Sequence, residues 1–254
     1  MNYKVTIVIP VYNGSNFMKV AIDSAIAQTY DNKDIIIVND GSTDNGETEK
    51  IALSYGNKIR YIKKENGGVA TALNLAIKEM KGDYLSWLSH DDIYKPYKIE
   101  KQIETIKKLE DKTTILFSNV ELIDEKGEIF CTTNYSNLMT HEELCQGIYP
   151  VIKGTVNGCS MLISKKCFDK VGLFNENLKT SNDYEMWLRL FKEFKSYLIE
   201  EPLIQYRIHK NQDTTKSPYT LKEANKLWVD IINNLTVKEI EGWSFEPFNV
   251  YMDL

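Results

Sequence analysis

The chain has no long apolar run and no surplus of positive charge. None of its hydrophobic stretches approaches the roughly 20 residues that cross a bilayer. Its 31 Lys and Arg are outnumbered by 36 Asp and Glu, which gives a net charge of −5. The first residues lead directly into a β-branched segment without the pattern of a secretory signal. We therefore expect a cytoplasmic protein with neither a membrane span nor a broad surface for nucleic acid.

Cysteine is scarce, and two glycine-rich motifs are missing. The four cysteines lack C-x-x-C spacing, so we expect free thiols rather than disulfides or a zinc site. Neither G-x-G-x-x-G nor a P-loop occurs. Their absence removes the main support for a dinucleotide-binding protein or an ATPase.

Segments of strand and helix character alternate over the first ninety residues. Residues 4–10 form a continuous β-branched run, which is typical of a strand buried on both faces. The further strands of this region are predicted over 34–38, 58–63 and 84–89. Helices between them indicate a parallel, right-handed βαβ sheet. The later elements are predicted as strands over 113–117, 120–123 and 128–132, an edge strand over 202–208, and helices over 182–194 and 219–235.

Two adjacent carboxylates, Asp91 and Asp92, follow the apolar run 84–89. Such a pair at the mouth of a buried strand is costly unless a cation lies beside it. Mg²⁺ and Mn²⁺ take one or two protein carboxylates together with phosphate oxygens. We interpret the pair as metal ligands. The alternative is that both residues only cap the helix predicted to begin near Pro96.

A second acidic cluster, residues 39–44 (NDGSTD), follows the second predicted strand. Ligands of α/β folds bind at the carboxyl ends of parallel strands. Asp40 can accept a hydrogen bond there from a base N–H or a ribose hydroxyl. The alternative is that Ser42 or Asp44 caps the next helix.

Three later segments carry further candidates. Asn66 and Gly67 precede a predicted helix, whose free N–H groups favour a polar or anionic ligand, although a plain turn explains them equally well. Asp183 opens another predicted helix, either as a general base or as a cap. Arg207 and His209 end the last strand, where they can meet phosphate charge and complete a metal shell. A histidine in a loop is also commonly inert.

In their order and spacing, these segments resemble the family 2 glycosyltransferases of GT-A fold. The resemblance extends from Val5 to about Asp213. It implies an α/β fold in which a mixed, mostly parallel central sheet is flanked by helices. The segments that carry it are 8–13 (VIPVYN), 39–44 (NDGSTD), 66–74, 88–92 (LSHDD), 182–189 (NDYEMWLR) and 206–209 (YRIH).

The resemblance implies inverting transfer of a sugar from a nucleotide-diphosphate donor to a hydroxyl, with Mn²⁺ or Mg²⁺. A UDP-sugar is the favoured donor and a dTDP-sugar the alternative. Asp183 would take the proton of the acceptor hydroxyl, and Asp91, Asp92 and His209 would bind the metal. The residues that would contact the donor are Pro10, Val11, Tyr12, Asn13, Asp40, Asn66, Gly67, His90, Asp91 and Arg207.

The sequence departs from the family pattern at three positions. Asn39 stands where many relatives carry Asp, Leu73 where Arg is common, and Ser89 at the first acidic position of the D-x-D motif. These departures leave open a catalytically inactive relative that binds nucleotide or carbohydrate. A sugar nucleotidyltransferase is the second alternative, although residues 12–15 lack the basic side chains that it needs after the first strand.

We predict one GT-A domain over residues 1–218, followed by a helical extension over 219–254. Within the domain, the nucleotide-binding half ends near 110 and the acceptor half begins at 111. A glycan or lipid-linked glycan is the expected acceptor, as in polysaccharide biosynthesis. The helix over 219–235 is more typical of a core or dimer contact than of a lipid anchor. Aromatic residues crowd the end of the chain, and the alternatives for them are packing on the domain, contact with the inner face of a membrane, or a place in a longer protein. These residues are Trp243, Phe245, Phe248 and Tyr251.

Overall fold

The structure, a computed structural model, describes residues 2–145, 147–210, 212 and 219–243. Its centre is a five-stranded sheet in the order β3-β2-β1-β4-β8. The strands are β1 (Val5–Val11), β2 (Lys33–Asp40), β3 (Arg60–Lys64), β4 (Tyr84–Trp87) and β8 (Ile163–Ser164). Only the β4–β8 pair in this sheet is antiparallel. The predicted parallel arrangement of the first four strands is confirmed.

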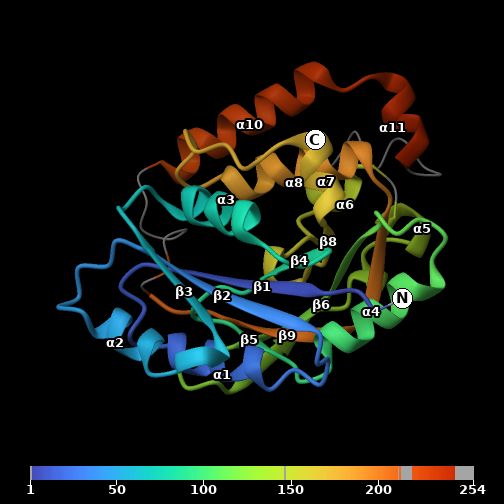
Figure 1. Cartoon of the computed structure of the whole chain (residues 1–254). Helices are drawn as coiled ribbons and strands as arrows, with labels where there is room; N and C mark the ends of the chain where they lie inside the picture. The colour runs from blue at the N-terminus through green and yellow to red at the C-terminus, as the bar shows by residue number, and fades with distance from the viewer. Residues whose placement is uncertain (1, 146, 211, 213–218, 244–254) are drawn as a thin grey trace.

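Helices cover both faces of this sheet because β1 is apolar on both sides. Ile7 and Ile9 pack with one set of helices, whereas Val8 faces the other set. The first set is α1 (Met18–Ile26), α2 (Glu47–Leu53) and α4 (Lys98–Lys108). The second set includes α3 (Val69–Glu79) and α8 (Asn182–Glu193), which lie above the sheet in Figure 1. The predicted α/β class is therefore confirmed.

A second sheet has the order β5-β9-β6-β7. Its strands are β5 (Ile93–Tyr94), β6 (Ile115–Ile123), β7 (Ile129–Thr132) and β9 (Ser196–Arg207). β9 pairs with β5 on one side and β6 on the other, so the prediction of an edge strand is wrong. Pro202 has no N–H to donate, but the β6–β9 register shifts between Ser118 and Val120. This irregularity accommodates the proline inside the sheet.

The remaining elements are short, except for one long helix near the end of the chain. Helix α10 (Thr220–Asn234) forms an outer layer over α8 and α3 (Figure 1) and is followed by α11 (Val237–Trp243). Trp228 and Ile231 of α10 pack on the core that contains α8. The short elements are η1 (Gly56–Lys58), η2 (Tyr135–Asn137), α5 (His141–Leu144), α6 (Tyr149–Ile152), η3 (Gly158–Ser160) and α7 (Lys165–Val171).

Two expectations for the end of the chain have different outcomes. Phe245, Phe248 and Tyr251 lie outside the described residues, so the role predicted for them stays a prediction. Within the described ranges, no helix is both long enough and apolar enough to cross a membrane. The division into a domain and an extension also stays a prediction.

The carboxyl ends of four parallel strands meet at one edge of the central sheet. Val11 of β1 is in register with Asn39 of β2, and Asp40 is in register with Lys64 of β3. On the other side of β1, the N–H of Leu88 donates to the carbonyl of Val8. The loops that follow β1, β2, β3 and β4 therefore gather along this edge, where α/β folds bind ligands.

Candidate functional site

The loops after β1 and β2 are hydrogen-bonded to each other. The N–H of Asn13 donates to Ser42 Oγ at 2.9 Å, and the N–H of Thr43 donates to Asn13 Oδ1 at 2.7 Å. Asn13 adopts the left-handed conformation, with φ of 50°. Tyr12, which is 46% exposed, places its hydroxyl 3.5 Å from Thr43 Oγ1. The two loops thus form one surface.

The predicted donor contacts in this region differ in their exposure. Pro10 and Val11 are buried at the end of β1, whereas Tyr12 and Asn13 are exposed. Only the latter two can present their side chains to a ligand without rearrangement of the strand.

Asp40 organises the loop before α3. Its carboxylate accepts hydrogen bonds from the N–H groups of Gly67 at 3.1 Å and Gly68 at 2.7 Å, and it pairs with Lys64 Nζ at 2.5 Å. Asn66 Nδ2 donates to the Asp40 carbonyl at 2.9 Å. The predicted residues Asp40, Asn66 and Gly67 therefore meet. The residue that sequence reasoning missed is Lys64, whose signal is a basic side chain at the end of the neighbouring strand.

Asp91 and His209 form a pair at the end of β4. His209 Nε2 lies 2.9 Å from Asp91 Oδ2, and both side chains are largely enclosed. The His209 ring packs against Phe17 with centroids 5.1 Å apart. His90 lies against the loop after β1, where a Cβ on Gly14 would come within 2.6 Å of the His90 ring. The close approach of the His90 ring to the loop therefore requires glycine at position 14.

Asp92 faces the interior instead of joining Asp91. It is 1% exposed, and its Oδ1 accepts the backbone N–H of Arg207 at 2.9 Å. Burial raises its pKa well above the usual range, and the Asp91 charge adds to this shift. The prediction that Asp92 binds metal stays a prediction: its Oδ2 is buried and has no hydrogen-bond partner among the described residues. Asp92 directly precedes β5, which pairs with β9, the strand that ends at Arg207.

Arg207 is also enclosed, at 4% exposed, and the prediction that it meets phosphate stays a prediction. Its Nε donates to the Asp91 carbonyl at 2.9 Å, and its Nη1 donates to the Asp124 carbonyl at 2.8 Å. The guanidinium lies 4.6 Å from the centre of the Phe17 ring. Arg207 therefore holds the backbone around Asp91 in place. These contacts do not support the alternative in which Asp91 and Asp92 cap the next helix.

Asp183 lies in the first turn of α8 and is half-buried. Burial raises its pKa to about 6, although the N–H of Tyr184, which donates to Oδ1 at 2.8 Å, acts in the opposite direction. A carboxylate with a pKa near 6 is mostly ionised at neutral pH. It is also a stronger base than an ordinary aspartate, which suits proton transfer.

Two indoles join the first turns of α8 to the end of β4. Trp187 lies one turn beyond Asp183 and packs against Trp87, with ring centroids 6.3 Å apart. A Cβ on Gly158 would come within 2.9 Å of Trp187 and 3.0 Å of Trp87. The contact places the start of α8 beside the strand that leads to Asp91. Asp183 and Asp91 are thereby carried by two elements that pack together.

Two buried polar atoms beside this joint have no hydrogen-bond partner in the described part of the chain. They are Trp87 Nε1 and Asn182 Oδ1. Buried donors and acceptors are ordinarily paired, so these two atoms are candidates for hydrogen bonds to a ligand. Sequence reasoning did not select either residue for binding.

A metal site made by the protein alone is absent among the residues that the structure describes. No three His, Cys, Asp or Glu side chains gather closely enough to hold an ion. The Asp91–His209 pair supplies one oxygen and one nitrogen ligand. The carboxylate oxygen fits Mn²⁺ or Mg²⁺, which complete their shells with phosphate oxygens and water, whereas the imidazole nitrogen is less suited to Mg²⁺.

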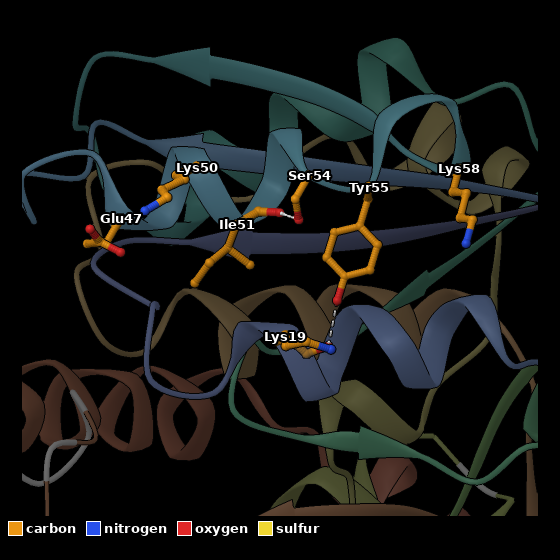
Figure 2. Close-up of a pocket in the computed structure, with 7 residues that line it drawn as sticks. All are labelled: Lys19, Glu47, Lys50, Ile51, Ser54, Tyr55 and Lys58. Atoms are coloured by element: carbon orange, nitrogen blue, oxygen red, sulfur yellow. Dashed lines mark hydrogen bonds between the residues drawn. The ribbon is translucent and has the colours of Figure 1, made fainter.

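A surface cavity of about 470 Å³ lies away from these residues, between α1 and the α2–η1 segment (Figure 2). Exposed charged side chains make up much of its wall, and Lys19 pairs with Asp23 at 2.7 Å. No candidate residue lines this cavity, so we do not place the site here. The lining residues are Lys19, Glu47, Lys50, Ile51, Ser54, Tyr55 and Lys58.

A family model described as Glycosyl transferase family 2 matches residues 6–172. The chain belongs to glycosyl transferase family 2. It is 47% identical over 244 residues to an uncharacterized glycosyltransferase of Rickettsia felis. The alignment covers 96% of this chain and 40% of that relative, so the chain spans less than half the relative's length. Asp183, Arg207 and His209 lie beyond the residues matched by the family model.

Solved structures of glycosyltransferases share the fold. S. aureus TarS 1–349 in complex with UDP-GlcNAc matches with a TM-score of 0.74 at 15% identity, covering 94% of this chain and 70% of that chain. The mannosyltransferase PcManGT from Pyrobaculum calidifontis, in complex with GDP-Man and Mn²⁺, matches with a TM-score of 0.68 at 15% identity, covering 92% and 65%. Both predictions, of the family 2 glycosyltransferases and of the GT-A fold, are confirmed.

Proposed function

We propose that this family 2 member transfers a sugar, with inversion, from a nucleotide-diphosphate donor to a hydroxyl of a glycan or lipid-linked acceptor. A UDP-sugar is the favoured donor and a dTDP-sugar the alternative. A cytoplasmic location is part of the proposal. One observation carries it: the Asp91–His209 pair and the basic carboxylate Asp183 lie on elements that pack together at the carboxyl edge of the sheet.

The donor side is supported by the loops after β1, β2 and β3. The exposed Tyr12 ring offers a face on which a base can stack, and Asn13 offers amide groups. Asp40 accepts three hydrogen bonds in the structure and retains capacity for another donor. A ribose hydroxyl or a base N–H fits that remaining capacity.

The leaving diphosphate develops negative charge. Asp91 and His209 would hold Mn²⁺ or Mg²⁺ there, and the metal when bound supplies Lewis-acid stabilisation of that charge. Arg207 and Asp92 keep the backbone around Asp91 in position through the contacts described above. PcManGT was solved with GDP-Man and Mn²⁺, which supports a metal-assisted reaction in this fold.

Asp183 acts as the base. The acceptor oxygen attacks C1 of the sugar from the face opposite the diphosphate, and the new C1–O bond forms as the bond from C1 to the phosphate oxygen breaks. The hydroxyl proton passes to the Asp183 carboxylate. One base is sufficient for inversion, and positioned proton transfer of this kind contributes roughly 10²–10⁴-fold to the rate.

The substitution Asp183→Asn tests the proposal. We expect kcat to fall at least about 100-fold while donor affinity is retained, because the amide cannot take a proton. In the unaltered protein, kcat should rise with pH through about 6, where the raised pKa of Asp183 leaves the carboxylate ionised above that value. The measurement is a pH series of transfer rates beside calorimetric donor titration.

Glu185→Gln is the matched control for Asp183→Asn. Glu185 lies in the same first turn of α8 and contributes the same charge to the helix N-terminus, but it pairs with Arg189 at 2.7 Å. Transfer should survive this change. Equal loss of activity in both variants, or loss of donor affinity in Asp183→Asn, would show that Asp183 only supports the helix.

An inactive binding protein is the alternative that the departures from the family pattern favour. Leu73 is fully buried in the core, and Ser89 bonds to the Cys159 thiol at 3.3 Å instead of offering a carboxylate. Retention of Asp91, His209 and Asp183 argues for activity. Hydrolysis of nucleotide sugars in the presence of Mn²⁺ separates the two, since only the enzyme releases the nucleotide diphosphate.

A further inference from the structure

The carboxylate of Glu223, in the first turn of α10, is bound to the segment that precedes α8. Three consecutive backbone N–H groups donate to it: those of Lys179 at 2.9 Å, Thr180 at 2.8 Å and Ser181 at 3.1 Å. The Thr180 hydroxyl adds a fourth contact at 3.1 Å. Glu223 lies 42 to 44 residues further along the chain than these donors.

The electrostatics of Glu223 agree with a tightly held anion. Burial alone would raise its pKa, but the three N–H groups outweigh burial and lower the pKa. Charge-assisted hydrogen bonds of this kind are stronger than neutral ones. Glu223 is therefore ionised at neutral pH and attached to residues 179–181.

The helix that receives this contact has no cap of its own. Ser181 is the N-cap residue of α8, and its side chain makes no capping hydrogen bond. The first N–H groups of a helix need partners, and an anion near the N-terminus is favourable. Glu223 supplies an anion at that end from another helix. Asp183 is two residues beyond Ser181, within the same turn.

A role limited to its own helix does not explain Glu223. An acidic residue in the first turn of α10 would favour that helix wherever its oxygens pointed. Here both oxygens are directed at residues 179–181. Helix α10 is also attached to the core through Trp228 and Ile231. The carboxylate thus fixes the start of α8 relative to α10.

We propose that Glu223 is a positioning residue for the base Asp183. By binding residues 179–181, it holds the first turn of α8 so that the Asp183 carboxylate meets the acceptor hydroxyl. This inference rests on the proposed function. It also assigns the α10 helix a part in the reaction, although α10 contributes no group to the reacting atoms.

The variants Glu223→Ala and Glu223→Gln test this role. Alanine removes all the contacts, whereas glutamine keeps one carbonyl oxygen in place. We expect kcat to fall about 10- to 100-fold in Glu223→Ala and less in Glu223→Gln, because small displacements of a catalytic group cost rates of that order. The donor KM should change less than about twofold, since the hydrogen bonds described for Glu223 go to residues 179–181 and not to the donor-side loops.

Lys192→Gln is the matched control. Lys192 near the other end of α8 pairs with Glu239 of α11 at 3.0 Å, so this change also removes a contact between α8 and the C-terminal helices. We expect kcat to be retained. Equal losses of kcat in Lys192→Gln and Glu223→Gln would mean that general docking of these helices matters, and would overturn the inference.

Two further measurements separate failure of this inference from failure of the proposed function. In an Asp183→Asn background, Glu223→Ala should cause no further loss of kcat, because both changes act on the same step. Hydrogen exchange at residues 179–181 should accelerate in Glu223→Ala whatever the reaction is. Unchanged exchange there, or full kcat in Glu223→Ala when Asp183→Asn is inactive, would overturn the role of Glu223. Full transfer by Asp183→Asn would instead overturn the base assignment, and with it this inference.

Discussion

At the residue scale, the adjacent carboxylates Asp91 and Asp92 have opposite surroundings. Asp91 pairs with His209, whereas Asp92 is more deeply enclosed and accepts a hydrogen bond from the N–H of Arg207. Asp91 lies in a turn in which the Asp92 N–H donates to the Ser89 carbonyl at 3.2 Å, and Asp92 leads directly into β5, so the two side chains have different partners. Asp91 is therefore the candidate metal ligand, and Asp92 supports the backbone at Arg207.

This division predicts different outcomes for two isosteric substitutions. Asp91→Asn should lower the affinity for UDP in the presence of Mn²⁺ by about tenfold or more, because a ligand charge is lost. Without metal, its affinity should match that of the unaltered protein. Asp92→Asn should retain affinity in both conditions, because the amide oxygen can still accept from Arg207. Calorimetric titration of UDP checks both; an equal loss in Asp92→Asn would contradict the assignment.

At the element scale, the joint between β4, η3 and α8 depends on a glycine, which has no side chain. Gly158 lies where the indoles of Trp87 and Trp187 approach, and an added Cβ would come within 2.9 Å of Trp187 and 3.0 Å of Trp87. Phe174 closes the other side of the same cluster, with its centroid 5.9 Å from that of Trp187. Rigid rings on both sides make this contact specific.

Gly158→Ala should therefore destabilise the protein by about 1–3 kcal/mol through overpacking. Transfer should also weaken, because the start of α8 moves relative to β4. Urea unfolding measures the first effect. Gly242→Ala is the control: a Cβ there meets nothing within 4 Å, and alanine favours the helix. A Gly158→Ala variant as stable as Gly242→Ala would show that the joint is loosely packed.

Elements with a local signal were predictable, and those that depend on distant partners were not. The β-branched run of β1 indicates burial on both faces, and the structure confirms it. The segment that begins at Pro202 was predicted as an edge strand because the irregularity of β9 around this proline shows only in its register with β6. Glu223 showed no signal, because its partners are far away in sequence. Arg207 could be assigned to the last strand, but its enclosure depends on packing against Phe17 and Asp124.

At the scale of the whole molecule, a buried lysine connects α4 to the central sheet. Lys98 Nζ donates to Ser86 Oγ at 2.8 Å and to Gln102 Oε1 at 2.9 Å, and it lies 4.3 Å from the centre of the Tyr94 ring. Burial lowers its pKa to about 7 from an ordinary value of 10.5, and the nearby Cys159 opposes this shift. The charged form is therefore unfavourable in the folded state.

Global stability should depend on pH through this residue. Between about 7 and 10.5 the unfolded chain binds more protons at Lys98 than the folded protein does, so the free energy of unfolding should rise with pH in that window. The slope due to one group is at most about 1.4 kcal/mol per pH unit.

Urea unfolding at pH 7, 8 and 9 checks this. We expect Lys98→Met to lose that part of the slope. Lys101→Met is the control, because ion pairing with Glu201 raises the pKa of Lys101, which stays charged over this window. Equal slopes in Lys98→Met and the unaltered protein would contradict the assignment.

The bonds between the loops after β1 and β2 have a consequence for how quickly a donor is captured. Asn13, Ser42 and Thr43 already hold one another before any nucleotide arrives. An incoming base therefore meets a preformed surface, and its encounter need not wait for those segments to become ordered. Donor association should then be governed by diffusion and charge instead of by slow local rearrangement.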